Sequence, residues 1–210
     1  MIYLIGGPPK CGKTTLAKKL SLNSKIPWVS ADTIQNVIKP YVDGSDFNSI
    51  FPVSSANFSS NDEKYNLLST DEIIKSYRAQ AKSMFAAIEA FVLSEITEGN
   101  DYIVEGYHLE PQYIDTLTQS HPGKVKGIVL AKFNESAFID SITKSTTEND
   151  WILSKTTDEN TYIKIAKMVS VYSHIYEVES KRYGIKLMRM DNDFEKSLHE
   201  AVGRLADLQE

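Results

Sequence analysis

The segment that most restricts the fold of this chain is GPPKCGKT at residues 7–14, which matches the phosphate-binding pattern G-x-x-x-x-G-K-[ST] at every fixed position. An unbroken apolar run of strand length precedes it at residues 1–5. Residues 15–20 follow it with helix-forming residues and an apolar stripe. Strand, glycine-rich loop and helix therefore come in the order that such a loop requires, and the segment predicts a site for a nucleoside triphosphate.

Each residue type in the loop has a physical role. Glycine accepts positive φ angles, so the backbone can approach phosphate closely, and the N–H groups at the start of the helix face anionic oxygens. Pro8 and Pro9 have no N–H, so the donors must come from residues 10–15. We expect Lys13 to neutralise the β- and γ-phosphates and the Thr14 hydroxyl to help coordinate a Mg²⁺. The residues expected to bind the nucleotide are Gly7, Lys10, Cys11, Gly12, Lys13, Thr14 and Thr15.

Composition narrows the possible functions. The 210 residues are 41% hydrophobic and carry a formal net charge of −5, so the basic surplus typical of nucleic-acid-binding proteins is missing. No apolar run approaches the length of a membrane span and no signal-like leader precedes the first strand, which predicts a cytoplasmic protein that does not bind membranes. The single cysteine, Cys11, excludes an intrachain disulfide. Its place in the loop allows a redox switch, but a small side chain at a variable position is the simpler interpretation.

Strand and helix patterns alternate along the chain. Long helices are expected at residues 70–98, 158–183 and 194–208, the second with Ile163 on its apolar stripe. Strands after the first are expected at 26–30, 101–105, 125–133 and 185–190. Alternation of this kind is typical of parallel strands joined by right-handed crossovers. It predicts a three-layer α/β/α fold around a five-stranded parallel sheet.

Two carboxylates follow predicted strands and are candidates for catalysis. Asp32 comes after the second strand and Glu105 ends the third, and in a parallel sheet this edge lines the ligand crevice. Either could help Thr14 hold Mg²⁺, and either could orient and deprotonate an acceptor hydroxyl. Two structural alternatives remain, Asp32 as the N-cap of the next helix and Glu105 as an ordinary strand end before a turn. His108 could touch the acceptor or be an incidental loop residue.

Two polar stretches interrupt the alternation. Residues 43–69 are rich in Ser, Asn and Asp with scattered aromatic residues, which predicts a long irregular excursion that binds the acceptor. Residues 134–160 are expected to form a lid that closes over the phosphates and expels water. This stretch has no arginine, so the residues of the lid that could neutralise charge on the phosphates are Lys144 and Lys155. Alternatively, both lysines lie on a helix face exposed to solvent.

The 70–98 helix carries one more candidate. Its apolar residues repeat at helical spacing on one face, and Arg78 and Gln80 lie off that face. Arg78 could act in catalysis by clamping a phosphate or carboxylate, or it could be a solvated surface arginine.

Together, residues 7–14, Asp32, the helix around Gln80 and the segment IVEGYHLEP at 103–111 resemble the small P-loop kinases, in particular the 2-phosphoglycerate kinase and zeta-toxin-like types. The resemblance implies a single P-loop kinase domain over residues 1–210, similar to adenylate and shikimate kinases. It also implies that ATP and Mg²⁺ are the cofactors and that the γ-phosphoryl group moves to a hydroxyl of a small metabolite.

Other functions are compatible with the same residues. The acceptor could be a nucleotide-sugar or the end of a polynucleotide, although the acidic net charge argues against the second. The chain could also be a regulatory module that binds ATP without acceptor-dependent turnover.

Overall fold

A computed structural model describes residues 1–145, 150–191 and 193–206. At its centre lies a sheet with the strand order β2-β3-β1-β4-β5, in which each neighbouring pair is parallel. The predicted α/β class with a five-stranded parallel sheet is confirmed. The strands are β1 (Ile2–Gly6), β2 (Trp28–Ser30), β3 (Tyr102–Glu105), β4 (Val125–Ala131) and β5 (Lys186–Arg189).

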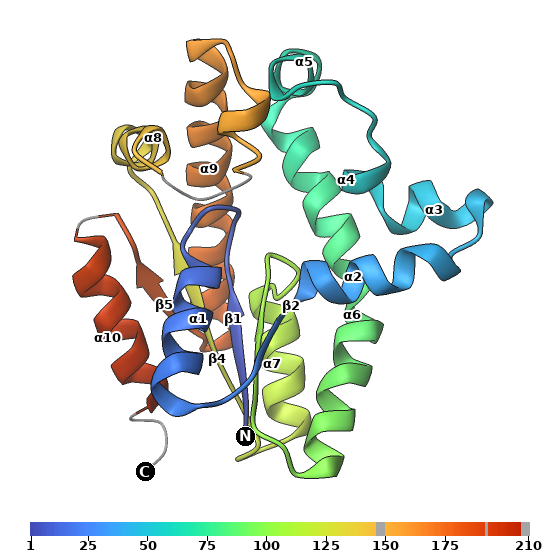
Figure 1. Ribbon diagram of the computed structural model, residues 1–210, viewed down its shortest axis with the longest axis vertical. Helices are drawn as coiled ribbons and strands as arrows, with labels where there is room; N and C mark the ends of the chain where they lie inside the picture. The colour runs from blue at the N-terminus through green and yellow to red at the C-terminus, as the bar shows by residue number, and fades with distance from the viewer. Residues whose placement is uncertain (146–149, 192, 207–210) are drawn as a thin grey trace.

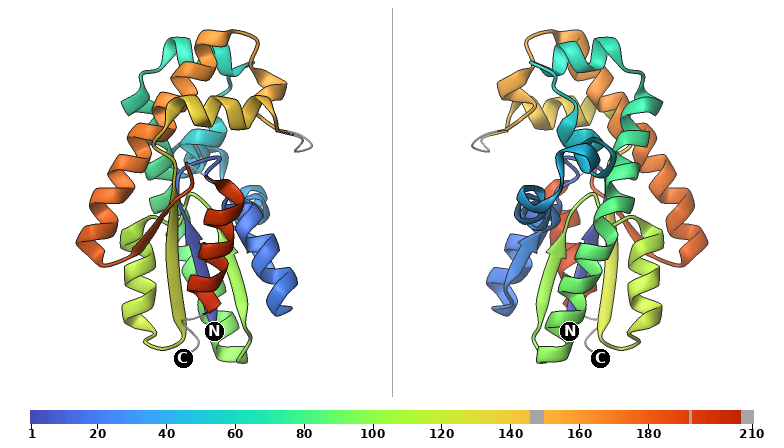
Figure 2. Two further views of the ribbon diagram at one scale, coloured as in Figure 1. Left: turned by 90° about the vertical axis from the view of Figure 1, so that its left-hand side faces the viewer. Right: turned by 90° about the vertical axis from the view of Figure 1, so that its right-hand side faces the viewer.

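Helices cover both faces of the sheet, as Figure 1 and Figure 2 show. Two of them, α1 (Lys13–Ser24) and α10 (Phe194–Ala206), pack against each other on one face. The other face carries α6 (Thr70–Glu98), α7 (Pro111–Ser120) and α9 (Glu159–Tyr183). The remaining helices are α2 (Ala31–Ile38), η1 (Lys39–Tyr41), α3 (Gly44–Ile50), α4 (Pro52–Ser55), α5 (Asn61–Leu67), α8 (Glu135–Thr143) and η2 (Leu153–Lys155).

The central strands β1, β3 and β4 are largely buried, as their continuous apolar runs require, whereas the edge strands β2 and β5 are more exposed. Every residue of β1 is buried, and so are the last four residues of β4. In the part of the chain that the structure describes, none of the helices combines the length and the apolar character needed to cross a bilayer.

The strand register brings three strand ends to one place. Ile5 of β1 pairs with Glu105 of β3, and Glu105 pairs with Ser30 of β2. Beyond these positions the chain enters the phosphate loop after β1 and α2 after β2. Because parallel strands end at the same edge of a sheet, the loop, the start of α2 and Glu105 become neighbours.

Residues 43–69 do not form an irregular excursion, which corrects the expectation from the sequence. They form the short helices α3, α4 and α5. Asp43 caps α3 by accepting a hydrogen bond from Gly44 N, and Ser60 caps α5 by accepting one from Glu63 N. The small polar residues that suggested a loop thus begin helices instead.

The segment expected to be a lid is also partly helical, and it contacts α5. It contains α8 and η2, while residues 146–149 lie outside the described residues. Asn61 Nδ2 donates to Trp151 O at 2.9 Å, and Asp62 Oδ2 accepts from Thr157 N at 2.9 Å. These bonds join residues 150–158 to α5 at the top of the molecule in Figure 1.

The buried faces of the two longest helices differ in detail from their predicted stripes. Gln80 was expected off the buried face of α6, but its side chain is fully buried. Hydrogen bonds to Gln35 and Tyr107 make this burial possible, because a buried amide needs partners. Ile163 was expected on the buried stripe of α9, but it is 52% exposed.

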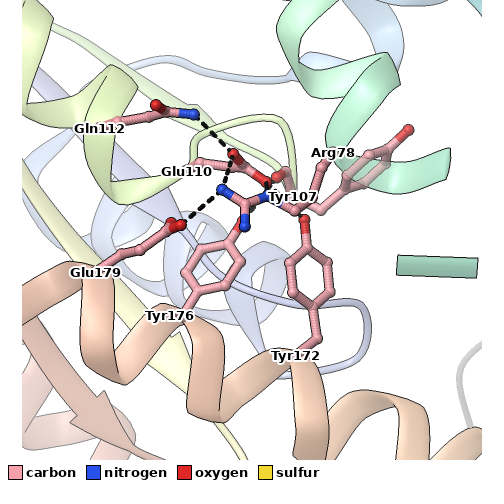
Figure 3. A network of polar contacts seen from close by, with 7 residues as sticks. All are labelled: Arg78, Tyr107, Glu110, Gln112, Tyr172, Tyr176 and Glu179. Atoms are coloured by element: carbon pink, nitrogen blue, oxygen red, sulfur yellow. Dashed lines mark hydrogen bonds and ion pairs between the residues drawn. The ribbon is translucent and has the colours of Figure 1, made fainter. Parts of the chain in front are cut away.

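Figure 3 shows a polar network that connects α6, α7 and α9. At its centre is Glu110, whose side chain is 1% exposed. Arg78 Nε lies 3.1 Å from Glu110 Oε1, and Arg78 Nη2 lies 2.6 Å from Glu179 Oε1. Tyr172 OH and Gln112 Nε2 also donate to Glu110, at 2.9 and 3.1 Å. A buried carboxylate with a cation and two further donors fixes the three helices relative to one another.

Two hydrogen bonds of Tyr107 extend this network toward the edge of the sheet. Tyr176 OH donates to Tyr107 O at 2.9 Å, and Tyr107 OH accepts from Gln80 Nε2 at 2.6 Å. The loop after β3 is therefore held from α9 and from α6.

We predict that Arg78→Met lowers the free energy of unfolding by about 3 kcal/mol, because it leaves the Glu110 carboxylate buried without its cation. This change in free energy is at the low end of the range for broken buried ion pairs, because the Arg78 side chain is 33% exposed. Urea denaturation measures the change. Arg182→Met, at an exposed position of α9, serves as the control and should stay within about 0.5 kcal/mol of the wild type. An Arg78→Met variant as stable as this control would contradict the structural role of the network.

Candidate active site

A cleft of about 940 Å³ opens where the three strand ends meet. Its walls come from the phosphate loop, α2, the α4–α5 segment, α6, the ends of β3 and β4, and the segment from α8 to η2. This volume is at the upper end of the range for small-molecule sites. It can hold a nucleotide together with a small second ligand.

The phosphate loop turns β1 into α1 through two glycines with positive φ. Gly7 has a φ of 137°, and a Cβ there would lie 2.2 Å from Leu130 O. Gly12, with a φ of 94°, is the N-cap of α1, and no described side chain caps this helix end. The N–H groups of the first turn are therefore open to an anion. Lys13 is buried and donates to Pro8 O at 2.7 Å, so its ammonium group is folded back over the loop.

Five of the seven residues expected to bind the nucleotide line the cleft, namely Lys10, Gly12, Lys13, Thr14 and Thr15. Gly7 does not line it and instead allows the loop to pack closely on β4.

Cys11 does not line the cleft either. Its side chain is fully buried, and burial raises the pKa of the thiol. A thiol with a raised pKa forms little thiolate at neutral pH. The geometry therefore supports a small buried side chain and not a redox switch.

Glu105 and Asp32 both line the cleft, but in different environments. Glu105 is 3% exposed and accepts from Thr14 Oγ1 at 2.9 Å, and burial raises its pKa against the opposing charge of Lys13. Asp32 faces the open cleft, whose walls desolvate its carboxyl and raise its pKa, again against Lys13. The N-cap of α2 is Ser30, which accepts from Asp32 N at 3.2 Å, so the N-cap alternative for Asp32 is wrong.

The oxygen atoms in the cleft fit a magnesium ion that shares its coordination with phosphates. Thr14 and Glu105 lie within hydrogen-bond distance of each other, and Asp32 lines the same cleft. Among the described residues, no group of three His, Cys, Asp or Glu side chains forms a complete metal site. Because Mg²⁺ takes one or two carboxylates and completes its shell with phosphate and water, this set suits an ion that arrives with the nucleotide.

Amide and hydroxyl groups form the wall beside the carboxylates. Gln80 Nε2 donates to Gln35 Oε1 and to Tyr107 OH, both at 2.6 Å. His108 lies behind this wall, fully buried, with Nε2 at 2.9 Å from Gln35 Oε1. Burial lowers the pKa of His108 to about 3, so it stays neutral. His108 does not line the cleft and supports Gln35 instead of touching an acceptor.

Within the described residues, the cations that line the cleft are all lysines, at positions 10, 13, 64, 132 and 155. Arg78, which the sequence made a candidate for catalysis, is not among the lining residues because its guanidinium is held by Glu110 and Glu179. Lys155 of the expected lid lines the cleft, whereas Lys144 does not. Lys10 pairs with the buried carboxylate of Asp150 at 2.7 Å, which links the phosphate loop to the lid segment.

Several lining residues were missed by reasoning from the sequence. The sequence could have indicated Lys132, because this residue directly follows β4 and so lies at the same sheet edge as the two carboxylates. Gln35 and Lys64 had no such signal, and Gln80 was named only for the family resemblance, because only the packing of their helices brings these residues to the cleft.

Comparison with known proteins points to kinases. The chain is 29% identical over 116 residues to the 2-phosphoglycerate kinase of Pyrococcus furiosus, a match that covers 54% of this chain and 37% of that protein. It is 26% identical over 117 residues to the mevalonate-3-phosphate 5-kinase of Thermoplasma acidophilum, a match that covers 55% of each chain. The matches thus span between about a third and a half of these relatives, and no protein-family model matches the chain.

Solved structures share the fold over nearly the whole chain. A gluconokinase from Sinorhizobium meliloti superposes with a TM-score of 0.54 at 14% identity, covering 98% of this chain and 91% of that one. A shikimate kinase from Bacteroides thetaiotaomicron gives 0.51 at 12% identity, covering 100% and 98%. At these identities the likeness establishes the fold alone. The chain therefore has the fold of the small P-loop kinases, with weak sequence homology to 2-phosphoglycerate kinase and mevalonate-3-phosphate 5-kinase.

Proposed function

We propose that this protein is an ATP-dependent phosphotransferase that moves the γ-phosphoryl group to a hydroxyl of a small metabolite. The observation that carries the proposal is that the open N-terminal end of α1, the Thr14–Glu105 pair and the Asp32 carboxylate all line one cleft. An anion site, a magnesium site and a base within one cleft are the components that phosphoryl transfer needs.

In the proposed reaction, the acceptor hydroxyl oxygen attacks the γ-phosphorus, and the bond from that phosphorus to the β,γ-bridging oxygen breaks to release ADP. Asp32 accepts the hydroxyl proton, because it faces the cleft and its raised pKa makes it a stronger base than an ordinary aspartate. Lys13 and the N–H groups of the first turn of α1 neutralise charge on the phosphates. A Mg²⁺ held by Thr14 and Glu105 would supply the remaining charge neutralisation.

The names of the similar proteins support a small acceptor. Two are kinases of phosphorylated metabolites, 2-phosphoglycerate and mevalonate 3-phosphate, and two are kinases of gluconate and shikimate. A single kinase domain over residues 1–210, with residues 43–69 at the acceptor and 134–160 as lid, belongs to the same proposal. So does a cytoplasmic location.

The direct test measures ADP formation with Mg²⁺ and ATP in the presence of hydroxy acids, sugars and nucleosides. We expect one class of acceptor to stimulate turnover and EDTA to abolish it. ATP binding without stimulation by any acceptor would favour the regulatory module instead.

We predict that Lys13→Ala weakens ATP binding about a hundredfold, because it removes charge-assisted contacts to the β- and γ-phosphates. Isothermal titration calorimetry with Mg²⁺ and ATP measures the affinity. Lys18→Ala, at an exposed position of the same helix, is the control and should bind ATP as the wild type does. Equal affinity in both variants would contradict the assignment of the phosphate loop.

We predict that Asp32→Asn lowers kcat by a factor of about 10²–10⁴ and leaves the affinity for ATP unchanged, since the base acts on the acceptor and not on the nucleotide. The wild-type rate should rise with pH through the raised pKa of Asp32, because only the deprotonated carboxylate can accept the proton. This rise should be absent in the variant. Asp71→Asn, in the exposed first turn of α6, is the matched control. A full rate in Asp32→Asn would exclude Asp32 as the base.

We predict a different defect for Glu105→Gln. Because Glu105 lies beside Thr14 and would hold the Mg²⁺ with it, this change should raise the Mg²⁺ concentration needed for half-maximal activity by about tenfold or more. A magnesium titration at saturating ATP measures it. An unchanged magnesium requirement would show that Glu105 serves another purpose.

A further inference from the structure

Lys64 is one of the cleft lysines to which the proposed mechanism gives no function. It lies on α5, half-buried, and lines the cleft next to Asn61 and Tyr77. Its Nζ is 5.2 Å from the ring centroid of Tyr77 and 5.8 Å from that of Tyr65. Aromatic faces at these distances attract a cation and hold the ammonium group in place.

No carboxylate of residues 1–145, 150–191 or 193–206 forms an ion pair with this ammonium group. The two acidic neighbours on α5 are engaged elsewhere, since Asp62 accepts from Thr157 N at 2.9 Å and Glu63 accepts from Ser59 N at 2.8 Å. Burial lowers the pKa of Lys64 to about 8, and no charge among the described residues opposes this shift.

The other lysines of the cleft differ from Lys64. Lys10 is paired with Asp150, Lys13 is bound to Pro8 O, and Lys132 donates to Ser141 Oγ at 3.2 Å. Lys155 is exposed and can be solvated by water. Lys64 alone among these five is partly desolvated without a polar partner in the described structure, so an anionic ligand would restore the interactions that its charge has lost.

Tyr77 connects Lys64 with the reacting end of the cleft. Asp32 and Tyr77 line the same cleft, and the charge of Asp32 adds to burial in raising the pKa of Tyr77. Lys64 lies over the same ring, and Tyr77 lines the cleft with both of them. A small acceptor lying along Tyr77 can thus present its hydroxyl to Asp32 and a charged group to Lys64.

We propose that Lys64 determines the specificity for the acceptor by binding an anionic group, a carboxylate or a phosphate ester, at the end opposite the reacting hydroxyl. The inference rests on the proposed phosphotransferase function and adds the chemical class of its acceptor. Asn61 and Gln80 also line the cleft, but their amide N–H groups are already donated within the protein, so Lys64 is the group left to bind this anion.

The test uses the full chain saturated with Mg²⁺ and a non-hydrolysable ATP analogue, so that the phosphate loop is occupied. Calorimetry then compares three probes that share a primary hydroxyl, which are glycerol, glycerate and glycerol 3-phosphate. We expect glycerate, glycerol 3-phosphate or both to bind and glycerol not to bind, and the stronger anion identifies the group that Lys64 recognises. Binding of glycerol as tight as that of the anions, or no binding of either anion, would overturn the inference.

Variants assign the binding to the ammonium group. Lys64→Met should lower the affinity for the anion about tenfold to a hundredfold. Lys75 is an exposed lysine of α6, and Lys75→Met should leave this affinity unchanged. Circular dichroism verifies that Lys64→Met is folded. An anion that binds equally well to Lys64→Met and Lys75→Met contradicts the inference.

The pH dependence gives a readout that a structural role would not produce. The affinity of the wild type should fall between pH 7 and 9.5, as Lys64 loses its proton, whereas Lys64→Arg should keep its affinity over this range. The other charged groups around Lys64 do not explain such a change. Tyr65 and Tyr77 have raised pKa values, Asp62 and Glu63 have lowered ones, and Lys164 of α9 is bonded to Asn66.

A failure of the inference can be distinguished from a failure of the proposed function. If the ATP analogue does not bind, the phosphotransferase itself is contradicted. If the analogue binds and Lys64→Met and Lys75→Met have the same affinity for the anions, only the proposed role of Lys64 is wrong.

Discussion

The parallel register of the three central strands is the constraint on which the site depends. Ile5, Glu105 and Ser30 lie side by side across β1, β3 and β2. Three different groups therefore lie at the same edge of the sheet. The open end of α1 follows β1, the buried carboxylate of Glu105 ends β3, and the first turn of α2 follows β2. A shift of one residue in either pairing would turn these side chains to the opposite face of the sheet.

Desolvation gives the groups at this edge their chemical character. The walls of the cleft raise the pKa of Asp32 and of Glu105, and they lower that of Lys64. The folded chain thus gathers charges of both signs in one cleft and leaves several of them incompletely neutralised. Such an arrangement is unfavourable for the empty protein, and ligands with phosphates, a metal ion and an anionic group would relieve it.

Two sets of polar contacts hold the cleft walls. The Arg78–Glu110 network joins α6, α7 and α9 below the cleft, and the bonds from Asn61 and Asp62 join α5 to residues 150–158 above it. The pKa of Asp62 is lowered to about 2 by its bonds from Thr157 and its neighbours, so its carboxylate remains charged at any physiological pH. The acceptor side and the lid side of the cleft are therefore in direct contact, and a movement of one would affect the other.

The sequence alone determined the elements whose signals are local. The phosphate loop is a contiguous motif, the strands are contiguous apolar runs, and Asp32 and Glu105 were found because each ends or follows such a run. The tertiary structure decided the rest, because those groups lie far apart along the chain. It removed Arg78 from the site by pairing it with Glu110 and Glu179, and it brought Gln80 and Lys64 into the cleft. Whether a polar side chain on a helix is solvated, paired or left facing a ligand depends on the neighbours that packing supplies, and no pattern along the sequence contains that information.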